Sequence, residues 1–480
     1  MVTIVVLYLA GMHGIAYWAS RRIQTNDDFM VAGRRLGPFM LAGTLAATEV
    51  GGGSSLGVAE KAYGEWGLSA CWYVLAMAIT FVLLAGLAPK LRGAMVKTVP
   101  EYFRARYGRK NGVYTALILI FPMVGLTAIQ LMASATILSV MTGLNYTWSV
   151  LVVTVLVTEY SILGGLWSVT LTDVVQWILI VVGCALVIPY GLDAAGGWAA
   201  IAAQLPEKKL SLTEGIGWKT IAALVVMYFT SFSVGQEVVQ RLYAARDEAS
   251  ARNGSLIAAG FYCVFAFIPA LIGIFAYSMV QAGTLDPALI EANGTRYVLP
   301  TMAIQVLPPA VVGLLFAALI SATMSSADSD LLAAGSIFAN DIYREHIKRD
   351  ATDAQVLRAT RWAMAVVGAL SLGVALLDLD DLITLLMFSF ALRAGGEFIP
   401  YVVGHFWRKP GAIASAGSIT VGCLTVVAVK NGVFSVYGLD PAIVGVGANA
   451  LVFVALTFIF GNGNGDSERT PTAPEPRESR

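Results

Sequence analysis

An apolar segment near the start of the chain is interrupted by the stretch ATEVGGGSS, residues 47–55. Each of its three consecutive glycines costs roughly 1 kcal/mol of helix propensity, and a carboxylate near mid-membrane costs roughly 2.5 kcal/mol or more. Non-helical backbone survives at that depth only where protein or a water-filled cavity surrounds it. The stretch therefore predicts a broken membrane helix whose break lines a binding site.

The composition is that of an all-α polytopic membrane protein. Hydrophobic residues make up 57% of the 480 residues, charged residues only 13%, and the mean hydropathy is +0.72. A helix that crosses the bilayer needs about 20 mostly apolar residues. We predict about thirteen such spans, and the break falls in the second of them. The predicted spans are 2–19, 37–58, 67–89, 112–142, 147–165, 168–190, 217–237, 253–281, 308–340, 359–377, 381–406, 411–429 and 441–460.

Basic residues predict the orientation of the spans, because Lys and Arg collect in cytoplasmic loops. With the N-terminus outside, most of the 31 Lys and Arg residues fall in inner loops, including residues 21–35 and 90–110. Thirteen spans then place the C-terminus in the cytoplasm. We expect residues 1–460 to form a single transmembrane domain and the polar tail, residues 461–480, to be disordered.

The spans divide into two comparable halves, the second to sixth and the seventh to eleventh. Five spans are an odd number, so the halves have opposite orientations. An interrupted helix at the same position in each half is the sequence pattern of a transporter site. The seventh span carries a weaker break at residues 230–237, around Gly235. A merely polar helix end is the alternative interpretation of this second break.

The ninth span carries a polar stripe that favours ion binding. On a helix, Ala322, Ser325, Ser326 and Ser329 fall at i, i+3, i+4 and i+7, on one face. Serine hydroxyls, combined with carbonyls freed by a helix break, can replace the water shell of a small cation. Serines that bond to their own helix and pack helices closely are the alternative. Two aspartates in the same stretch and a broken partner helix favour the interpretation that the stripe binds an ion.

Several motifs, in order along nearly the whole chain, resemble those of the sodium/solute symporter family. This resemblance implies a LeuT-like inverted repeat of five plus five helices with broken core helices. It also implies uptake of a small solute, since members take up proline, sugars, pantothenate, iodide, sialic acid or choline. The motifs are most similar to those of the high-affinity choline transporter branch. They are DDFMVAGRRLGP at 27–38, VPEYFRARYG at 99–108, GGLWSVTLTDVVQ at 164–176, VVQR at 238–241 and ATMSSADSDLLAAGSIFANDIY at 322–343.

The resemblance also implies where sodium binds. The family's main sodium site uses carbonyls of the first core helix together with a carbonyl and two hydroxyls of the eighth. Matched residue by residue, these ligands are Ala47, Val50, Ala322, Ser325 and Ser326.

A second ion is implied less directly. The family's acidic residue in the fifth core helix matches Asp173, and one further serine matches Ser329. Asp328 stands where members with two sodium ions carry a serine, and the open roles for it are to strengthen a cation site, to hold a proton or to pair with a base. The group Asp173, Asp328 and Ser329 is therefore expected to hold either a second ion or a proton.

The substrate is expected to differ from plain choline. The choline branch uses an aromatic cage, which suits a quaternary ammonium through cation–π attraction. Its tryptophans match Glu49 and about Gly235 here. Glu49 can pair with a cationic substrate. In the alternative, Arg393 neutralises Glu49 or Glu397, and the substrate is zwitterionic or neutral. The predicted substrate-binding residues are Glu49, Gly51, Gly52, Gln130, Gly235, Gln236 and Arg393.

Together these observations predict a sodium-coupled symporter that imports a small polar organic solute by alternating access. Its expected partners are the solute, Na⁺ and the lipid bilayer, with no nucleic acid. It is expected to work as a monomer in the bacterial inner (cytoplasmic) membrane. The alternatives are a proton-coupled symporter of the same fold and a solute sensor, which the short tail disfavours. An enzyme is not expected, because the chain lacks a nucleophile–base or metal motif.

Overall fold

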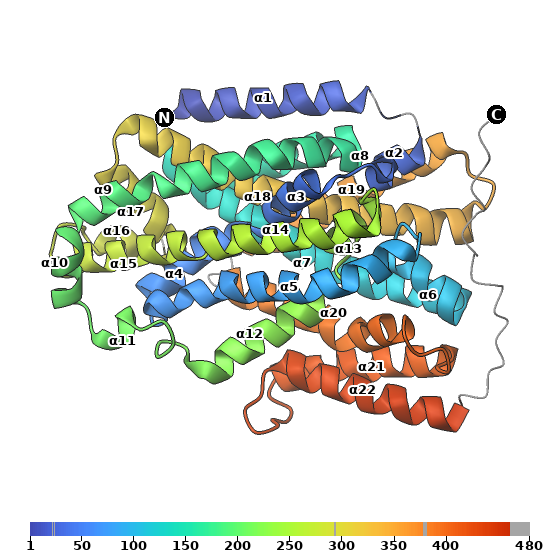
Figure 1. Ribbon diagram of the computed structural model, residues 1–480. Coiled ribbons are helices and arrows are strands. Elements are labelled where there is room, and N and C mark those ends of the chain that lie inside the picture. The colour runs from blue at the N-terminus through green and yellow to red at the C-terminus, as the bar shows by residue number, and fades with distance from the viewer. Residues whose placement is uncertain (22, 24, 292–293, 378–381, 461–480) are drawn as a thin grey trace.

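The protein is helical throughout the residues that the structure describes (Figure 1). This computed structural model describes residues 1–21, 23, 25–291, 294–377 and 382–460. The tail that we predict to be disordered, residues 461–480, lies outside them. The helices, with η marking 3-10 and π turns, are α1 (Val2–Ser20), α2 (Asn26–Val31), η1 (Ala32–Arg34), α3 (Pro38–Glu49), η2 (Gly53–Gly57), α4 (Val58–Tyr63), η3 (Gly67–Cys71), α5 (Trp72–Gly93), α6 (Val99–Tyr107), α7 (Arg109–Thr142), α8 (Tyr146–Ala185), α9 (Val187–Ala194), α10 (Gly197–Gln204), α11 (Glu207–Leu210), α12 (Gly217–Phe232), α13 (Gln236–Ala244), α14 (Glu248–Phe265), α15 (Phe267–Gln281), α16 (Ala288–Glu291), η4 (Thr295–Tyr297), α17 (Val298–Val306), α18 (Pro309–Ile337), η5 (Phe338–Ile347), α19 (Asp353–Ala375), α20 (Leu382–Gly404), α21 (Ala412–Lys430) and α22 (Pro441–Phe460).

Polar side chains fix the start of several helices. Thr98, Asn145 and Asp247 precede α6, α8 and α14, and each accepts a hydrogen bond from the N–H group three residues further on. These bonds satisfy donors that the first turn of a helix leaves free. The loops between the apolar helices therefore end at defined residues.

The helices match the predicted spans. Among the described residues, nine helical stretches are long and apolar enough to cross a membrane, and the bent pair α12–α13 makes ten. The stretch Tyr146–Ala194 holds two spans, because the 40 residues of α8 measure about 60 Å, twice the hydrocarbon core. Gly165, with φ 52°, divides them. The broken pair α3–α4 and the 23-residue α19 cover two further predicted spans, although neither is among the ten that are long and apolar enough by themselves.

One predicted boundary is wrong in a way that matters for the site. The seventh span was expected to end at residue 237, but α13 continues to Ala244. Its last turns stay inside the protein, because Arg246 N–H and the carbonyl of Ala244 pair with Leu36 at a β-bridge. Arg241, which the orientation argument counted among the inner-loop residues, is therefore fully buried.

Helix α18 lies at the centre of the molecule. In the stretch that contains α18, 83% of the apolar window is buried, against 22% for α1 and for α22 at the two ends of the described chain. Helices α7, α8 and α19 surround it, and in Figure 1 most helices run along the same long axis. The polar stripe on α18 is thus held inside a helical bundle.

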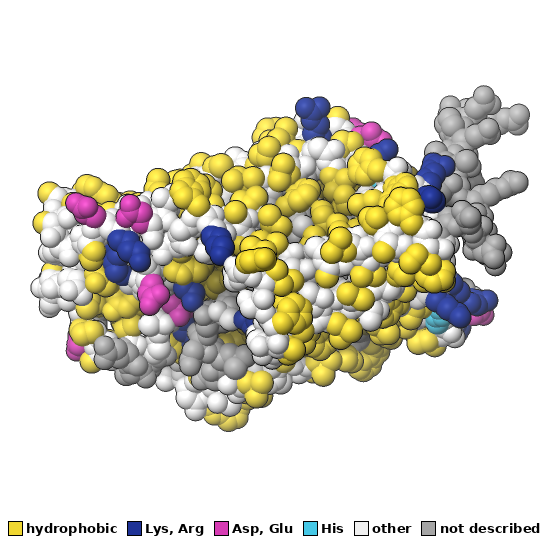
Figure 2. Space-filling view, turned by 90° about the horizontal axis from the view of Figure 1, so that it is seen from below, with side chains coloured by type: hydrophobic (Ala, Val, Ile, Leu, Met, Phe, Trp, Pro, Cys, Tyr) yellow, Lys and Arg dark blue, Asp and Glu magenta, His cyan; other side chains and the backbone are white. Residues whose placement is uncertain are grey.

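The surface between the two ends of the long axis is largely apolar (Figure 2). Charged side chains in that view lie mainly toward the ends. Large apolar side chains such as Trp362 on α19 and Leu451 on α22 are 73% and 75% exposed. Exposed apolar surface of this extent is what a lipid-facing protein presents.

Candidate functional site

The break in the second span lies where the sequence predicts it. Helix α3 ends at Glu49, Val50 leaves the helical region with ψ 78°, and the π-helix η2 starts at Gly53. The Ser54 hydroxyl donates a hydrogen bond to the carbonyl of Glu49 at 2.9 Å. The break thus exposes backbone groups within the protein interior, where only neighbouring side chains or a ligand can satisfy them.

Glycine is required at the break because other helices come very close. A Cβ on Gly51 would lie 2.5 Å from Oε1 of Gln130 on α7 and 2.6 Å from Oγ of Ser326 on α18. The next residue, Gly52, donates its N–H to Oε1 of Gln130 at 2.8 Å. Of the predicted substrate residues, Gly51, Gly52 and Gln130 are therefore in mutual contact.

Two serines of α18 join this helix to the end of α3. The Ser325 hydroxyl donates to the carbonyls of Ala47 at 2.8 Å and Ala322 at 3.0 Å. The Ser326 hydroxyl donates to the carbonyls of Thr48 at 2.6 Å and Ala322 at 3.1 Å. Four predicted sodium ligands, Ala47, Ala322, Ser325 and Ser326, therefore come together.

This oxygen group fits a small hard cation. Each hydroxyl has two lone pairs besides its proton, and each carbonyl has two. Ser325 and Ser326 are buried, so a cation among them would exchange its water for these oxygens. Val50, the fifth predicted ligand, lies at the break itself and shares no hydrogen bond with this group among the described residues.

A second oxygen group surrounds a buried arginine that the sequence analysis did not place in the site. Nη2 of Arg241 contacts Asp173 Oδ2 at 3.2 Å and Ser329 Oγ at 2.6 Å, and its Nε contacts Thr44 Oγ1 at 2.8 Å. Asp173 and Ser329, two of the residues predicted for a second ion or a proton, thus meet at a guanidinium. Asp328 is also fully buried, and neither of its oxygens accepts a well-formed hydrogen bond from a described residue.

The second broken helix carries an ion pair at its break. Helices α12 and α13 meet at 57°. Arg393 of α20 pairs with Glu237 Oε1 at 2.6 Å, and its Nε donates to the Ser231 hydroxyl at 2.5 Å. A Cβ on Gly235 would lie 2.6 Å from that Glu237 oxygen, so the glycine leaves room for the pair.

This pair contradicts the alternative interpretation in which Arg393 neutralises Glu49 or Glu397, because its ion-pair partner is Glu237. The bend at Gly235 directs the first turn of α13 toward α20. The Glu237 carboxylate therefore lies within ion-pair distance of the Arg393 guanidinium. The side chain of Gln236, a predicted substrate residue, takes no part in this ion pair and makes its hydrogen bonds to another segment. Its amide donates to the carbonyl of Lys97 and accepts from the N–H of Val99, at the start of α6.

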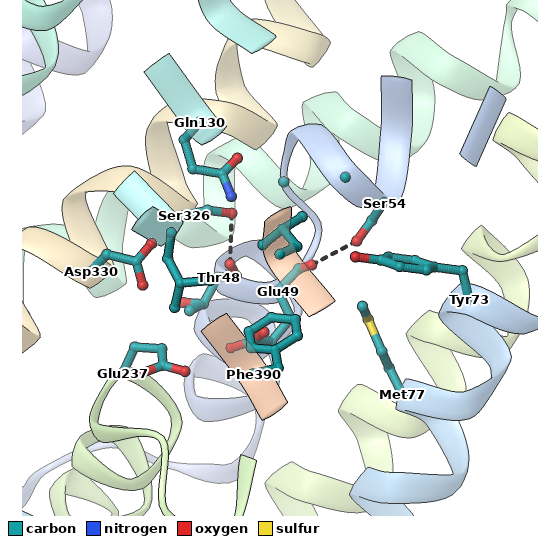
Figure 3. A pocket seen from close by; sticks show the side chains of 14 residues that line it. Thr48, Glu49, Ser54, Tyr73, Met77, Gln130, Glu237, Ser326, Asp330 and Phe390 are labelled. Carbon is teal, nitrogen blue, oxygen red and sulfur yellow. Dashed lines mark hydrogen bonds between the residues drawn. The ribbon is translucent and has the colours of Figure 1, made fainter. Parts of the chain in front are cut away.

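The two breaks and α18 enclose a small pocket (Figure 3). Its free volume is about 20 Å³, enough for a water molecule, which needs about 10–15 Å³, but not for an organic solute. Three carboxylates line it, and among the described residues only that of Glu237 has a Lys or Arg within 4 Å. The lining residues are Thr48, Glu49, Gly51, Gly53, Ser54, Tyr73, Met77, Leu126, Gln130, Glu237, Ser326, Asp330, Leu386 and Phe390.

Asp330 in this lining was not among the predicted site residues. It follows Ser326 by four residues, so the period that identifies the serine stripe also places Asp330 beside it on α18. Figure 3 shows Asp330 and Glu237 on the same side of the pocket. Arg241 lies outside the predicted span, and its one signal in the sequence was its place at the end of the motif VVQR, residues 238–241.

Known proteins resemble this chain over most of its length. The sodium/pantothenate symporter of Haemophilus influenzae is 26% identical, over 92% of this chain and 93% of that protein. The human high affinity choline transporter 1 is 29% identical, over 78% of this chain and 67% of that protein. Both relatives are transporters and neither is an enzyme, as the sequence predicts.

A solved structure confirms the predicted fold. The substrate-bound outward-open state of a Na⁺-coupled sialic acid symporter superposes with a TM-score of 0.81 at 21% identity, covering 95% of this chain and 97% of that one. The chain thus has the LeuT-like inverted repeat of two five-helix halves. The model of the sodium:solute symporter family matches residues 29–420. The chain therefore belongs to the sodium:solute symporter family, and it is a sodium-coupled membrane transporter of a small solute.

Proposed function

We propose that the transported solute is a small organic amine, cationic or zwitterionic, that binds in the pocket between the two broken helices. The observation that carries this proposal is the charge of the lining. Glu49 and Asp330 have no Lys or Arg within 4 Å among the described residues, and Arg393 is already paired with Glu237. A buried carboxylate without a counter-charge is costly. An amine supplies that charge.

Aromatic side chains complete the environment for an amine. Tyr73 and Phe390 line the pocket beside Glu49. The negative face of an aromatic ring attracts a cation that lies over it. The relatives' names include choline, which is a cation, and pantothenate, which is an anion, so the family alone does not decide the charge.

Sodium is proposed to bind at Ala47, Val50, Ala322, Ser325 and Ser326. Ser325 and Ser326 link α18 to the broken end of α3, so an ion held by both helices would fix the break in one arrangement. Ser326 and Gly51 also line the neighbouring pocket, so the sodium ion and the solute would bind on adjacent sides of these residues. One sodium entering at 100 mV supplies roughly 2.3 kcal/mol from the membrane potential.

The small size of the pocket supports transport by alternating access. Its free volume of about 20 Å³ excludes an organic solute, so the helices that form its walls must separate before one enters or leaves. Residues 1–460 are proposed to act as one domain and as a monomer. The proposed location is the lipid bilayer of a bacterial inner membrane. The proposed orientation has the N-terminus outside, where the basic residues place it.

Uptake into proteoliposomes with an imposed sodium gradient tests this function. The screen covers amines, betaines, amino acids, carboxylates and sugars, and Glu49→Gln is run beside the wild type. We expect sodium-driven uptake of an amine that Glu49→Gln weakens. Uptake of an anion would contradict the proposed substrate class. Uptake driven by a pH gradient in sodium-free medium would contradict the proposed role of the sodium site.

A further inference from the structure

We propose that Arg241 is a built-in cation that fills a second cation site, so that the chain binds one sodium ion and not two. This inference rests on the sodium site proposed above and specifies its stoichiometry. It also assigns a role to Asp173 and Ser329 different from the one predicted for them.

The oxygen atoms around Arg241 form the kind of group that holds a hard cation. They comprise the Asp173 carboxylate, the hydroxyls of Thr44 and Ser329, and the carbonyl of Glu237, which accepts from Nη1 at 2.7 Å. Carboxylate, hydroxyl and carbonyl oxygens are the ligands that hard cations prefer. Here the guanidinium occupies the space between them.

The group is drawn from four helices and closed to solvent. It joins α3, α8, α18 and α13, and the side chains of Arg241 and Asp173 are both 0% exposed. Thr44 also donates its hydroxyl to Asp173 Oδ2, so the carboxylate has a cation and a donor. A mobile cation entering this space would meet a fixed positive charge.

The filled group lies one helical turn from the proposed sodium site. The Ser329 hydroxyl donates to the carbonyl of Ser325 at 2.6 Å and lies 3.2 Å from Thr48 Oγ1. The two groups share α3 and α18 but differ in charge, because the first has no carboxylate ligand and the second has Asp173. The arginine neutralises the group that contains the Asp173 carboxylate, whereas the group of neutral oxygens around Ser325 is left to bind sodium.

Removing the guanidinium should open the second group to sodium. In Arg241→Ala, the Asp173 carboxylate loses its counter-charge, and the buried Asp328 carboxyl belongs to the residue directly before Ser329 on α18. Two buried acids with free oxygens would then recruit a cation. Arg241→Lys keeps the positive charge and is the matched control.

The test is equilibrium binding of radioactive sodium to the purified full chain, which needs no knowledge of the solute. We expect one saturable site per chain in the wild type and in Arg241→Lys, two in Arg241→Ala, and one again in Arg241→Ala combined with Ser325→Ala. Gel filtration checks that each variant is folded.

Two sites in the wild type would overturn the inference, as would a folded Arg241→Ala that gains none. Should Arg241→Ala not fold, the wild-type count alone decides between one ion and two. A wild type without any saturable site contradicts the proposed sodium site instead. In that case a site gained by Arg241→Ala still supports the role of Arg241, so the two failures are distinguishable.

Discussion

Helices α3 and α12–α13 are both broken near the centre of the bundle, and they expose different chemistry at the break. The α3 break presents neutral carbonyls to the serines of α18. The α12–α13 break is bridged by the buried pair Arg393–Glu237. Neutral hard oxygens can replace the water of a small ion, whereas fixed charges recognise an organic ion by its sign. The comparison assigns sodium binding mainly to the first break, and recognition of the substrate's charge to the pocket between the two breaks.

The largest effect is expected from Arg393→Ala at the second break. This change leaves the Glu237 carboxylate buried without its cation, and breaking a buried pair costs about 3–5 kcal/mol. Thermal unfolding of the purified protein in detergent measures the loss. Adding Glu237→Gln should recover part of it, because the uncompensated charge is then removed.

Arg246→Ala is the control for this prediction. Arg246 pairs with Asp247, but the two side chains are 62% and 52% exposed. Exposed pairs contribute little to stability. If both arginine variants unfold at the same temperature, the charged break is not a structural element of the protein.

The next effect is expected from Glu49→Gln in the pocket. Removing one partner of a buried charge pair costs about 2–5 kcal/mol of binding, so the affinity for a cationic amine should fall at least about 30-fold. The sodium concentration that half-saturates uptake should stay within about twofold, because Glu49 contributes no oxygen to the group around Ser325. A parallel loss of sodium affinity would show that substrate binding and sodium binding do not depend on separate residues.

A smaller effect is expected from Gly51→Ala at the first break. The added methyl group meets Gln130 and Ser326 at about 2.5 Å, and overpacking of this kind costs about 1–3 kcal/mol. Stability and sodium-driven uptake should fall together. Gly260→Ala on α14 is the control, since nothing lies within 4 Å of its new methyl group. Equal tolerance of both changes would mean that the close approach at Gly51 is unnecessary.

Most of the fold can be predicted from the sequence because it follows from local patterns. Apolar length predicts the spans, Gly51–Gly53 predicts the first break, and the spacing of Ser325 and Ser326 predicts a shared face. The weaker signal at Gly235 also marks a real bend. Each of these features depends on residues close together in the chain.

The charged partners could not be predicted, because they depend on distant segments. Arg241 looks like a loop residue until α13 is seen to fold inward, where it meets Asp173, 68 residues away. Arg393 had two acidic candidates by position, but the bend of α13 brings a third, Glu237, into contact. Pairing across helices depends on their tilt and rotation, which the apolar pattern leaves open.

The central claim is that sodium binds between the first break and the serines of α18. Its most direct test is the sodium concentration that half-saturates uptake in Ser325→Ala and Ser326→Ala. Losing one uncharged oxygen ligand of an ion is worth about 1.5 kcal/mol, so each change should raise this concentration about tenfold.

Ser255→Ala is the matched control, because Ser255 is also buried but its hydroxyl, among the described residues, bonds only to the carbonyl of Ala251 within α14. The account predicts wild-type sodium dependence for this control and the tenfold shift for Ser325→Ala and Ser326→Ala. Unchanged sodium dependence in both α18 variants, with folded protein, would contradict it.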